Sequence, residues 1–254
     1  MTHYLIEYRF QGKVKAEIKQ MIFTLDKKFH LGLSNKPIPH ISFAGPLATN
    51  DEAKLIKDFI SLCKNTTFCS FKVNGFGFFE RTKVVYINID PSDKLKNFRW
   101  KLSQKIKNYC TLRDFDYKED FAFHATLAMK LENPEFLAIK KYIEKQNSPR
   151  YKHFLIRATI IKNSRILCEY DFLQRRMLTR EEALNKNQLA ITMKLLNDFF
   201  EGNFDPDEKT KSSSSKSNHK KPATKKLKSP SPKPKPQKSG LIEKIKKIVK
   251  KVIR

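Results

Sequence analysis

The chain has 254 residues, and 52 Lys and Arg against 26 Asp and Glu give it a formal net charge of +26. No apolar run approaches the roughly 18 residues that a membrane-spanning helix needs, and Glu7 and Arg9 interrupt the apolar N-terminal stretch, so no signal peptide is expected. The cysteines form no C-x-x-C pair, which argues against a zinc ribbon and favours reduced core thiols in an intracellular protein; they are Cys63, Cys69, Cys110 and Cys168.

The basic charge falls in two regions of different character. Residues 205–254 hold 17 Lys and Arg against 4 Asp and Glu, and residues 1–204 hold 35 against 22, so each region carries +13. With 39% hydrophobic residues and 20 Phe in the chain, the first region suits one domain with its own core. The second has too few large apolar residues to fold before its last segment.

The spacing of apolar residues predicts alternating strands and helices in the first region. The predicted strands cover about residues 4–10, 41–44, 68–79, 84–89 and 121–129, followed by a hairpin of residues 151–161 and 165–173. The first predicted helix covers about residues 13–31, the second runs from a cap at Asn50 or Asp51 to about 64, and the third runs from the segment 91–93 to about 109. The fourth runs from a cap at Asn133, before Pro134, to about 146, and the last runs from a capping box of Thr179 with Glu182 to about 200. Strand–helix–strand–helix therefore occurs twice, over residues 4–64 and 84–146, which predicts a duplicated α+β domain with a pseudo-two-fold axis.

Two of the six histidines occupy matching strands of the two repeats. His40 precedes Ser42 by two residues, and His124 precedes Thr126 by two residues. Residues i and i+2 of a strand share a face, so each histidine should point the same way as its hydroxyl partner. The residues between and after them should point into the layer of helices; they are Ile41, Phe43, Ala125 and Leu127. The other histidines have no such partner and no place in the repeat; they are His3, His30, His153 and His219.

A pseudo-two-fold axis would bring both pairs into one central cleft. Two imidazoles can act together as base and acid near neutral pH, and two hydroxyls can hydrogen-bond the non-bridging oxygens of a phosphate. No carboxylate or cysteine cluster has the spacing of metal ligands. The pattern therefore predicts phosphate chemistry without a metal or another cofactor.

These residues resemble a known family. The two motifs are similar to the paired H-x-[ST] motifs of the two-histidine (2H) phosphoesterases, and the chain most resembles their RNA 2′,3′-cyclic phosphodiesterase and 2′-5′ RNA ligase-like branch. The segments flanking the motifs, and residues 75–79 followed by 84–87, are also similar to that family. The resemblance covers about residues 1–175.

The resemblance implies a bilobal α+β fold in which two antiparallel sheets surround a cleft and the helices lie outside. It also implies hydrolysis of a cyclic phosphate by in-line attack. By analogy, His124 would be the base that activates water, His40 the acid that protonates the leaving ribose oxygen, and Ser42 and Thr126 the groups that hold the phosphate. The pseudo-symmetry leaves the acid and base roles exchangeable.

Further residues are candidates for substrate contacts around the cleft. Arg81 and Lys130, which stands where the family often has Arg, are expected to contact phosphate. Phe43, Phe79 and Tyr86 are expected to stack on bases. Each of these also suits an ordinary surface or core position.

The segments after the predicted catalytic domain, residues 1–175, are a helical extension, residues 176–204, and a linker rich in Lys, Pro and Ser, residues 205–240. The linker is expected to be disordered. Residues 241–254 have apolar residues at helical spacing with lysines on the other face, which predicts a cationic amphipathic helix. An anionic membrane surface, a protein partner and nucleic acid all suit it, and docking on its own domain is a further alternative.

The sequence therefore predicts a cyclic phosphodiesterase that converts 2′,3′-cyclic phosphate ends of RNA or nucleotides to 2′-phosphates, with reverse 2′-5′ RNA ligation as an added activity. A non-catalytic module that binds nucleotides or RNA ends, tethered to a membrane or partner by the basic helix, is the alternative. A third reading takes the cyclic phosphate of ADP-ribose or another small nucleotide as the substrate. The expected location is cytoplasmic, or nuclear in a eukaryote, where the lysine-rich tail could act as an import signal.

Overall fold

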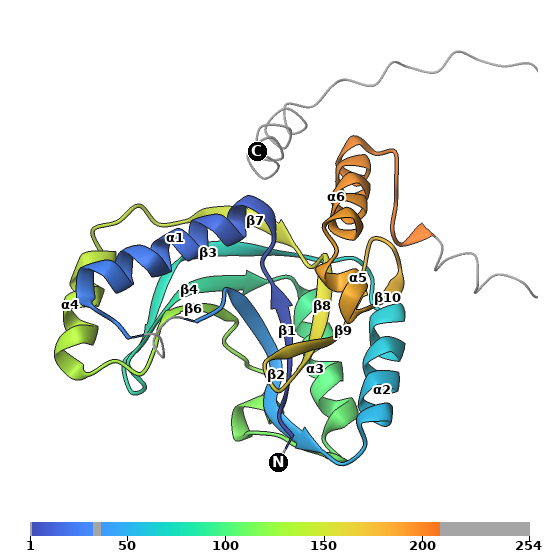
Figure 1. Cartoon of the computed structure of the whole chain (residues 1–254), viewed down its shortest axis with the longest axis horizontal. Helices are drawn as coiled ribbons and strands as arrows, with labels where there is room; N and C mark the ends of the chain where they lie inside the picture. The colour runs from blue at the N-terminus through green and yellow to red at the C-terminus, as the bar shows by residue number, and fades with distance from the viewer. Residues whose placement is uncertain (1, 33–36, 209–254) are drawn as a thin grey trace, which may run out of the picture.

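The computed structural model describes residues 2–32 and 37–208 (Figure 1). The predicted terminal helix and all but the first four residues of the predicted linker lie outside the described residues. The helices are α1 (Gly12–Phe29), α2 (Glu52–Lys64), α3 (Asp93–Ile106), the 3₁₀ helix η2 (Asp114–Tyr117), α4 (Asn133–Ile143), α5 (Arg180–Leu184) and α6 (Lys186–Glu201). The strands are β1 (Tyr4–Arg9), β2 (His40–Thr49), β3 (Ser70–Phe79), β4 (Val84–Pro91), β5 (Cys110–Thr111), β6 (His124–Ala128), β7 (Arg150–Phe154), β8 (Arg157–Lys162), β9 (Arg165–Asp171) and β10 (Arg176–Thr179).

The strands of the described residues form two antiparallel sheets. One sheet has the order β10-β9-β8-β1-β2-β5, and the other has the order β6-β4-β3-β7. Helices α1 and α4 pack against each other and against strands of the second sheet, whereas α2 packs on α3 and α3 contacts β2. Figure 1 shows these helices on the outside of the sheets. The predicted α+β fold, with antiparallel sheets and outer helices, is confirmed.

The two repeats place their motif strands alike. In the first repeat β2 pairs antiparallel with β1, and His40 lies opposite Arg9. In the second repeat β6 pairs antiparallel with β4, and His124 lies opposite Asn88. Each histidine is the first residue of its strand. The duplication therefore holds in the pairing of the strands as well as in the order of the elements.

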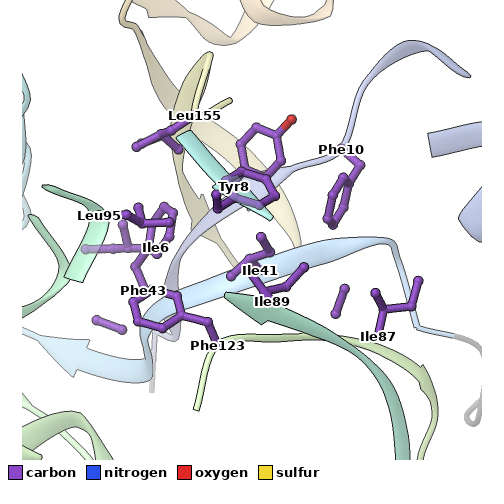
Figure 2. Packing of buried hydrophobic residues seen from close by; sticks show 14 of the residues in the cluster. Ile6, Tyr8, Phe10, Ile41, Phe43, Ile87, Ile89, Leu95, Phe123 and Leu155 are labelled. Carbon is purple, nitrogen blue, oxygen red and sulfur yellow. The ribbon is translucent and has the colours of Figure 1, made fainter. Parts of the chain in front are cut away.

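The core lies on one face of each motif strand and its neighbour (Figure 2). The alternate residues Ile6 and Tyr8 of β1, Ile41 of β2 and Ile87 of β4 are fully buried. Burying a side chain of this size stabilises a fold by about 1.5–3 kcal/mol. Neighbouring residues in a strand point to opposite faces. The side chains that alternate with these buried residues therefore lie on the other face of the strands; they are Glu7, Arg9, His40 and Ser42.

The predicted caps are mostly found where the sequence indicates them. Asp51 accepts a hydrogen bond from the main-chain N–H of Lys54 at 2.8 Å, and Thr179 forms the capping box with Glu182 at the start of α5. The prediction that Asn133 caps α4 is wrong, because Glu132 is the N-cap residue and α4 already includes Asn133.

Two predicted elements are each divided in the structure. The first arm of the predicted hairpin becomes β7, which pairs with β3, and β8, which pairs with β1 and β9 in the other sheet. The predicted last helix is interrupted at Asn185, whose side chain accepts from the N–H of Asn187 and begins α6. The first break places β7 and β8 in different sheets, and the second divides the predicted helix into α5 and α6.

The four cysteines are buried and free, as the sequence predicts. Burial raises the pKa of Cys69 and of Cys168 to about 12 each, and that of Cys110 to about 11. Burial also raises the pKa of Cys63 well above its ordinary value. Within residues 2–32 and 37–208, no helix has both the length and the apolar character needed to cross a membrane.

Candidate active site

The two His-x-hydroxyl motifs line a single cleft of about 1250 Å³. His40 and Ser42 reach it from β2, and His124 and Thr126 reach it from β6. Strands β2 and β6 belong to different sheets but contact each other. The structure therefore brings together the four residues that the sequence singles out.

Both imidazoles are held by the same main-chain contact. Nδ1 of His40 lies 2.6 Å from the carbonyl oxygen of Ile38, and Nδ1 of His124 lies 2.8 Å from the carbonyl oxygen of Ala122. A carbonyl oxygen only accepts, so each Nδ1 carries the hydrogen and donates it. Nε2 is then the ring nitrogen left for a substrate in each histidine, and the contact fixes the orientation of the ring.

The ring of His124 lies in an apolar environment. Phe79 and Tyr86 place their rings with centroids 5.0 and 5.2 Å from that of His124. Burial lowers the pKa of His124, and the nearby His40 lowers it further, while the hydrogen bond to Ala122 opposes both effects. The neutral form of His124, which can accept a proton, therefore persists to lower pH than in an exposed histidine.

The ring of His40 faces charged groups instead. Oε2 of Glu7 lies 3.7 Å from Nε2 of His40, and Oε1 of Glu7 accepts a hydrogen bond from Nε of Arg9 at 2.5 Å. Sequence reasoning missed Glu7 and Arg9 as site residues. The signal was the alternation in β1, where Leu5, Glu7 and Arg9 share the face opposite to the buried residues and line the cleft.

Three of the predicted substrate contacts lie at or beside the cleft. Phe79 and Arg81 line it. Tyr86 packs its ring against Phe79, with 4.3 Å between centroids, and thereby contacts the side of the His124 ring. Aromatic side chains therefore flank His124, and Arg81 adds a cation to the same cleft, which together suit a base and a phosphate.

Of the other two predicted contacts, the one at Phe43 is wrong and the one at Lys130 stays a prediction. Phe43 is fully buried and packs edge-to-face on Phe98, so it belongs to the core (Figure 2) and cannot stack on a base. This agrees with the strand alternation, which predicts Phe43 on the helix side. Lys130 is exposed just beyond the end of β6, next to Met129, which lines the cleft, and its contact with phosphate stays a prediction.

The loop that contains η2 forms another wall of the cleft. Arg113, Phe115 and Lys118 line the cleft from this loop, and sequence reasoning missed all three. Beneath them the buried guanidinium of Arg99 donates hydrogen bonds to the carbonyl oxygens of Phe43, Phe115 and Lys118. The sequence contains only a weak signal that these residues belong to the site, because the loop has no periodic apolar pattern.

A buried carboxylate completes the support of this loop. Asp116 is fully buried and lies 3.8 Å from a guanidinium nitrogen of Arg99. It also accepts from the main-chain N–H groups of Gly45, at 3.4 Å, and Arg113, at 3.3 Å. Burial raises the pKa of Asp116, and these donors offset part of that rise. The loop wall is therefore fixed to β2 and α3 through polar contacts in the interior.

This arrangement can perform proton transfer on both sides of a phosphate. Two histidines, each the first residue of a strand that lines the cleft, can supply the acid and the base, and two hydroxyls can supply hydrogen bonds to phosphate oxygens. The cations Arg9, Arg81, Arg113 and Lys118 surround the cleft and favour an anionic substrate. Among residues 2–32 and 37–208 no group of three or more His, Cys, Asp or Glu is placed to hold a metal ion.

Comparison with solved structures finds chains of similar fold at low identity. E. coli LigT complexed with 3′-AMP is 14% identical, covers 70% of this chain and 94% of its own, and gives a TM-score of 0.40. TT0787 of Thermus thermophilus is 12% identical, with 66% and 97% covered and a TM-score of 0.48. Kluyveromyces marxianus Usb1 with uridine monophosphate is 8% identical, with 65% and 95% covered and a TM-score of 0.39.

Comparison with curated proteins gives no match. Comparison with family models gives a match over residues 12–165 to the model described as the 2′-5′ RNA ligase superfamily. The matched residues are more than half of the chain and contain both His-x-hydroxyl motifs. The chain therefore belongs to the 2′-5′ RNA ligase superfamily, whose members are two-histidine phosphoesterases.

Proposed function

We propose that the protein hydrolyses 2′,3′-cyclic phosphate ends of RNA to 2′-phosphates. The observation that carries the proposal is the shared cleft: both His-x-hydroxyl motifs line it, and each histidine is oriented by a main-chain carbonyl. Membership of the superfamily supports an enzymatic role for this cleft. Reverse 2′-5′ ligation would use the same groups in the opposite direction.

The reaction needs one proton accepted and one donated. A water oxygen attacks phosphorus while one histidine takes a proton from the water. The bond between phosphorus and the 3′-oxygen breaks, and the other histidine gives that oxygen a proton, so the product has a 3′-hydroxyl and a 2′-phosphate. Ser42 and Thr126 donate hydrogen bonds to the non-bridging oxygens, where charge increases in the transition state.

The dimensions of the cleft favour an RNA end over a single small nucleotide. Sites for small ligands usually have about 300–1,000 Å³, whereas this cleft has about 1250 Å³. Its cations come from separate elements: Arg9 from β1, Arg81 from the β3–β4 turn, and Arg113 and Lys118 from the ends of η2. Cations distributed in this way suit a chain of phosphates better than one phosphate.

The test is a product assay with an RNA oligonucleotide that ends in a 2′,3′-cyclic phosphate, in the presence of EDTA. We expect a 2′-phosphate product, and we expect His40→Ala and His124→Ala each to lower kcat by about 10²–10⁴-fold, the usual contribution of one acid or base. His30→Asn is the matched control, because His30 is exposed at the end of α1 with a positive φ that Asn tolerates.

Three outcomes would contradict the proposal. Unchanged turnover in both alanine variants would exclude the two-histidine mechanism. A 3′-phosphate product would mean that the bond between phosphorus and the 2′-oxygen breaks instead of the bond to the 3′-oxygen. Binding of the oligonucleotide with no turnover by the unmodified protein would favour the non-catalytic alternative.

A further inference from the structure

The β6-β4-β3-β7 sheet has a polar face beside the cleft. One side of its strands is buried in the core by Phe71, Val73, Ile87 and Ile89. The alternate residues point to the other side, and the register of the strands places them next to one another across the sheet. We call this surface the open face; its residues are exposed or partly exposed, and they are Lys72, Asn74, Asn88, Asp90, Arg150 and Lys152.

The open face is continuous with the catalytic cleft. Strands β4 and β6 are neighbours in the sheet, and Asn88 lies directly opposite His124 across them. Residues that are opposite in a strand pair have adjacent side chains on the same face. At the other end the open face is limited by α6, because Phe199 and Phe200 pack on Phe154 of β7. A polymer bound at His124 can therefore continue onto the open face one strand away.

Two asparagine amides on the open face are held in fixed orientations. Asp90 accepts a hydrogen bond from Nδ2 of Asn74 at 2.7 Å and another from Nδ2 of Asn88 at 3.2 Å. Each amide keeps its oxygen and its second N–H for a ligand. Unpaired bases of RNA present donors and acceptors on their edges that such amides can bind.

The cations of the open face are placed where they repel one another. Lys72 lies directly opposite Lys152 of β7, and like charges in such a pair destabilise a sheet. A lysine on an edge strand such as β7 prevents pairing with other chains, but Lys72 is on β3, which has a partner strand on each side. Within the described part of the chain, neither lysine forms an ion pair, and neither does Arg150. A phosphate bound between the cations would offset their repulsion.

We propose that the open face binds the single-stranded RNA segment that precedes the terminal nucleotide. The phosphates of this segment lie on Lys72, Lys152 and Arg150, and its bases contact the amides of Asn74 and Asn88. Charge complementarity and continuity with the cleft are the arguments for RNA as the occupant. The inference rests on the function proposed above, since it names the part of the substrate that lies beyond the cyclic phosphate.

The first experiment measures binding and needs no turnover. A fluorescent RNA of about eight nucleotides that ends in a 2′-phosphate is titrated with the full chain over a series of salt concentrations, and binding is followed by anisotropy. In the triple variant Lys72→Gln, Arg150→Gln, Lys152→Gln we expect weaker binding. We also expect the slope of log K against log salt concentration to become shallower by about 2, since each phosphate contact with a single strand contributes about 0.7.

A second triple variant is the matched control. Lys57→Gln, Lys64→Gln and Lys101→Gln remove the same charge from exposed positions of α2 and α3, and we expect them to leave the slope nearly unchanged. The basic residues after residue 208 are the same in all three proteins. The urea midpoint of the open-face variant should be no lower than that of the unmodified protein, because the substitutions remove like-charge repulsion. Equal slopes in the two triple variants would overturn the inference.

The second experiment compares two substrates of different length. One is an RNA of about eight nucleotides with a 2′,3′-cyclic phosphate end, and the other is a mononucleotide 2′,3′-cyclic phosphate, which has no segment to place on the open face. The open-face variant should raise KM for the RNA by about tenfold or more with kcat unchanged, and should leave the kinetics of the mononucleotide unchanged. Asn74→Ala should raise KM for the RNA several-fold and have no effect on the mononucleotide. Equal losses on both substrates would contradict the inference.

Two further outcomes separate this inference from the proposed function and from another occupant. If the unmodified protein hydrolyses neither substrate, the proposed function is refuted, while the anisotropy titration still decides whether the open face binds RNA. Vesicles of phosphatidylcholine with phosphatidylserine are the other arm. Loss of vesicle binding in the open-face variant, with RNA binding unchanged, would overturn the inference in favour of a membrane surface.

Discussion

At the scale of single residues, Gly77 shows how a missing side chain can position an active-site ring. Gly77 pairs across β3 and β4 with Tyr86. A Cβ atom at Gly77 would lie 2.3 Å from Cε2 of the Tyr86 ring, which is far inside van der Waals contact. Glycine in a strand often marks such a close approach. Here it lets the Tyr86 ring lie flat over the strand, beside Phe79 and His124.

We predict that Gly77→Ala moves the Tyr86 ring and thereby disturbs His124. The extra methyl group should cost about 1–3 kcal/mol of unfolding free energy, as overpacking usually does, and should lower kcat/KM on a cyclic phosphate by about tenfold or more. Urea unfolding and steady-state kinetics measure the two effects. Gly32→Ala, at a position with no atom within 4 Å of the added Cβ, is the control. Unchanged kinetics in Gly77→Ala would show that the Tyr86 ring does not position His124.

At the scale of elements, the loop around η2 depends on a polar interior. Arg99 reaches it from α3 and donates to two of its carbonyl oxygens, and Asp116 lies inside it as a counter-charge. Removing one partner of such a buried ion pair leaves the charge of the other partner buried without a counter-charge. The exposed side chains Arg113 and Phe115 owe their position at the cleft to this buried support.

We predict that Asp116→Asn loosens the loop without damaging the acid–base chemistry. The uncompensated Arg99 should lower the unfolding free energy by about 2 kcal/mol. KM for RNA should rise several-fold, while kcat stays within about twofold, because the loop binds substrate and carries neither histidine. Hydrogen exchange of residues 112–121 should become faster. Asp114→Asn, an exposed neighbour in the same 3₁₀ helix, is the control. A fall in kcat with an unchanged KM would contradict this account.

At the scale of the whole molecule, His153 joins the two sheets inside the core. It belongs to β7, and its Nε2 lies 2.6 Å from the hydroxyl of Tyr8, on β1 of the other sheet. Its ring stacks on Phe10, and its edge meets Phe71. Burial lowers the pKa of His153 from 6.5 to about 4. The neutral ring is thus the form that the folded protein accommodates.

This burial predicts loss of stability in acid. Because the folded-state pKa lies below the unfolded value, the unfolded chain binds the proton first as the pH falls from about 6.5 to about 4. The contribution of His153 to the unfolding free energy that is lost over this pH range is on the order of 3 kcal/mol. Urea unfolding at pH 7 and at pH 4 measures it.

The control is the double variant Tyr8→Phe with His153→Phe, which removes both hydrogen-bonding partners and leaves no orphaned polar group. Its unfolding free energy should decrease less between pH 7 and pH 4 than that of the unmodified protein. An equal decrease in both proteins would exclude His153 as the source.

Most of the fold could be predicted from the sequence, because long elements have clear periodicity. The spacing of Val14, Ile18, Ile22 and Leu25 gives α1, and all four are buried. The errors lie where tertiary contacts decide. The segment 151–161 contains no Gly or Pro and suits one strand, but pairing with β3 and then with β1 divides it between two sheets. The strands β5 and β10 are too short to show a period.

The centre of the site could also be predicted, because a repeated motif marks matching strands. The side chains that form the walls of the cleft could not be predicted, since they depend on which face of each strand meets the cleft. The aromatic ring of Phe43 suits a wall that stacks on bases, but its position in the strand alternation places it in the core. Glu7 is the opposite case, because a charged residue within an apolar strand does not by its type indicate a site, and only its position in the alternation places it on the cleft face.

The buried cysteines have a practical consequence for labelling the molecule. Thiol-specific reagents attack the exposed thiolate, and every cysteine of the chain is both covered and held in its protonated form by a raised pKa. A cysteine introduced on the surface would therefore be the only fast-reacting thiol, with no need to remove the native ones. Spin labels or fluorophores could then be attached to the β3–β4 turn and to the η2 loop, on two walls of the cleft, to record the distance between them with and without RNA.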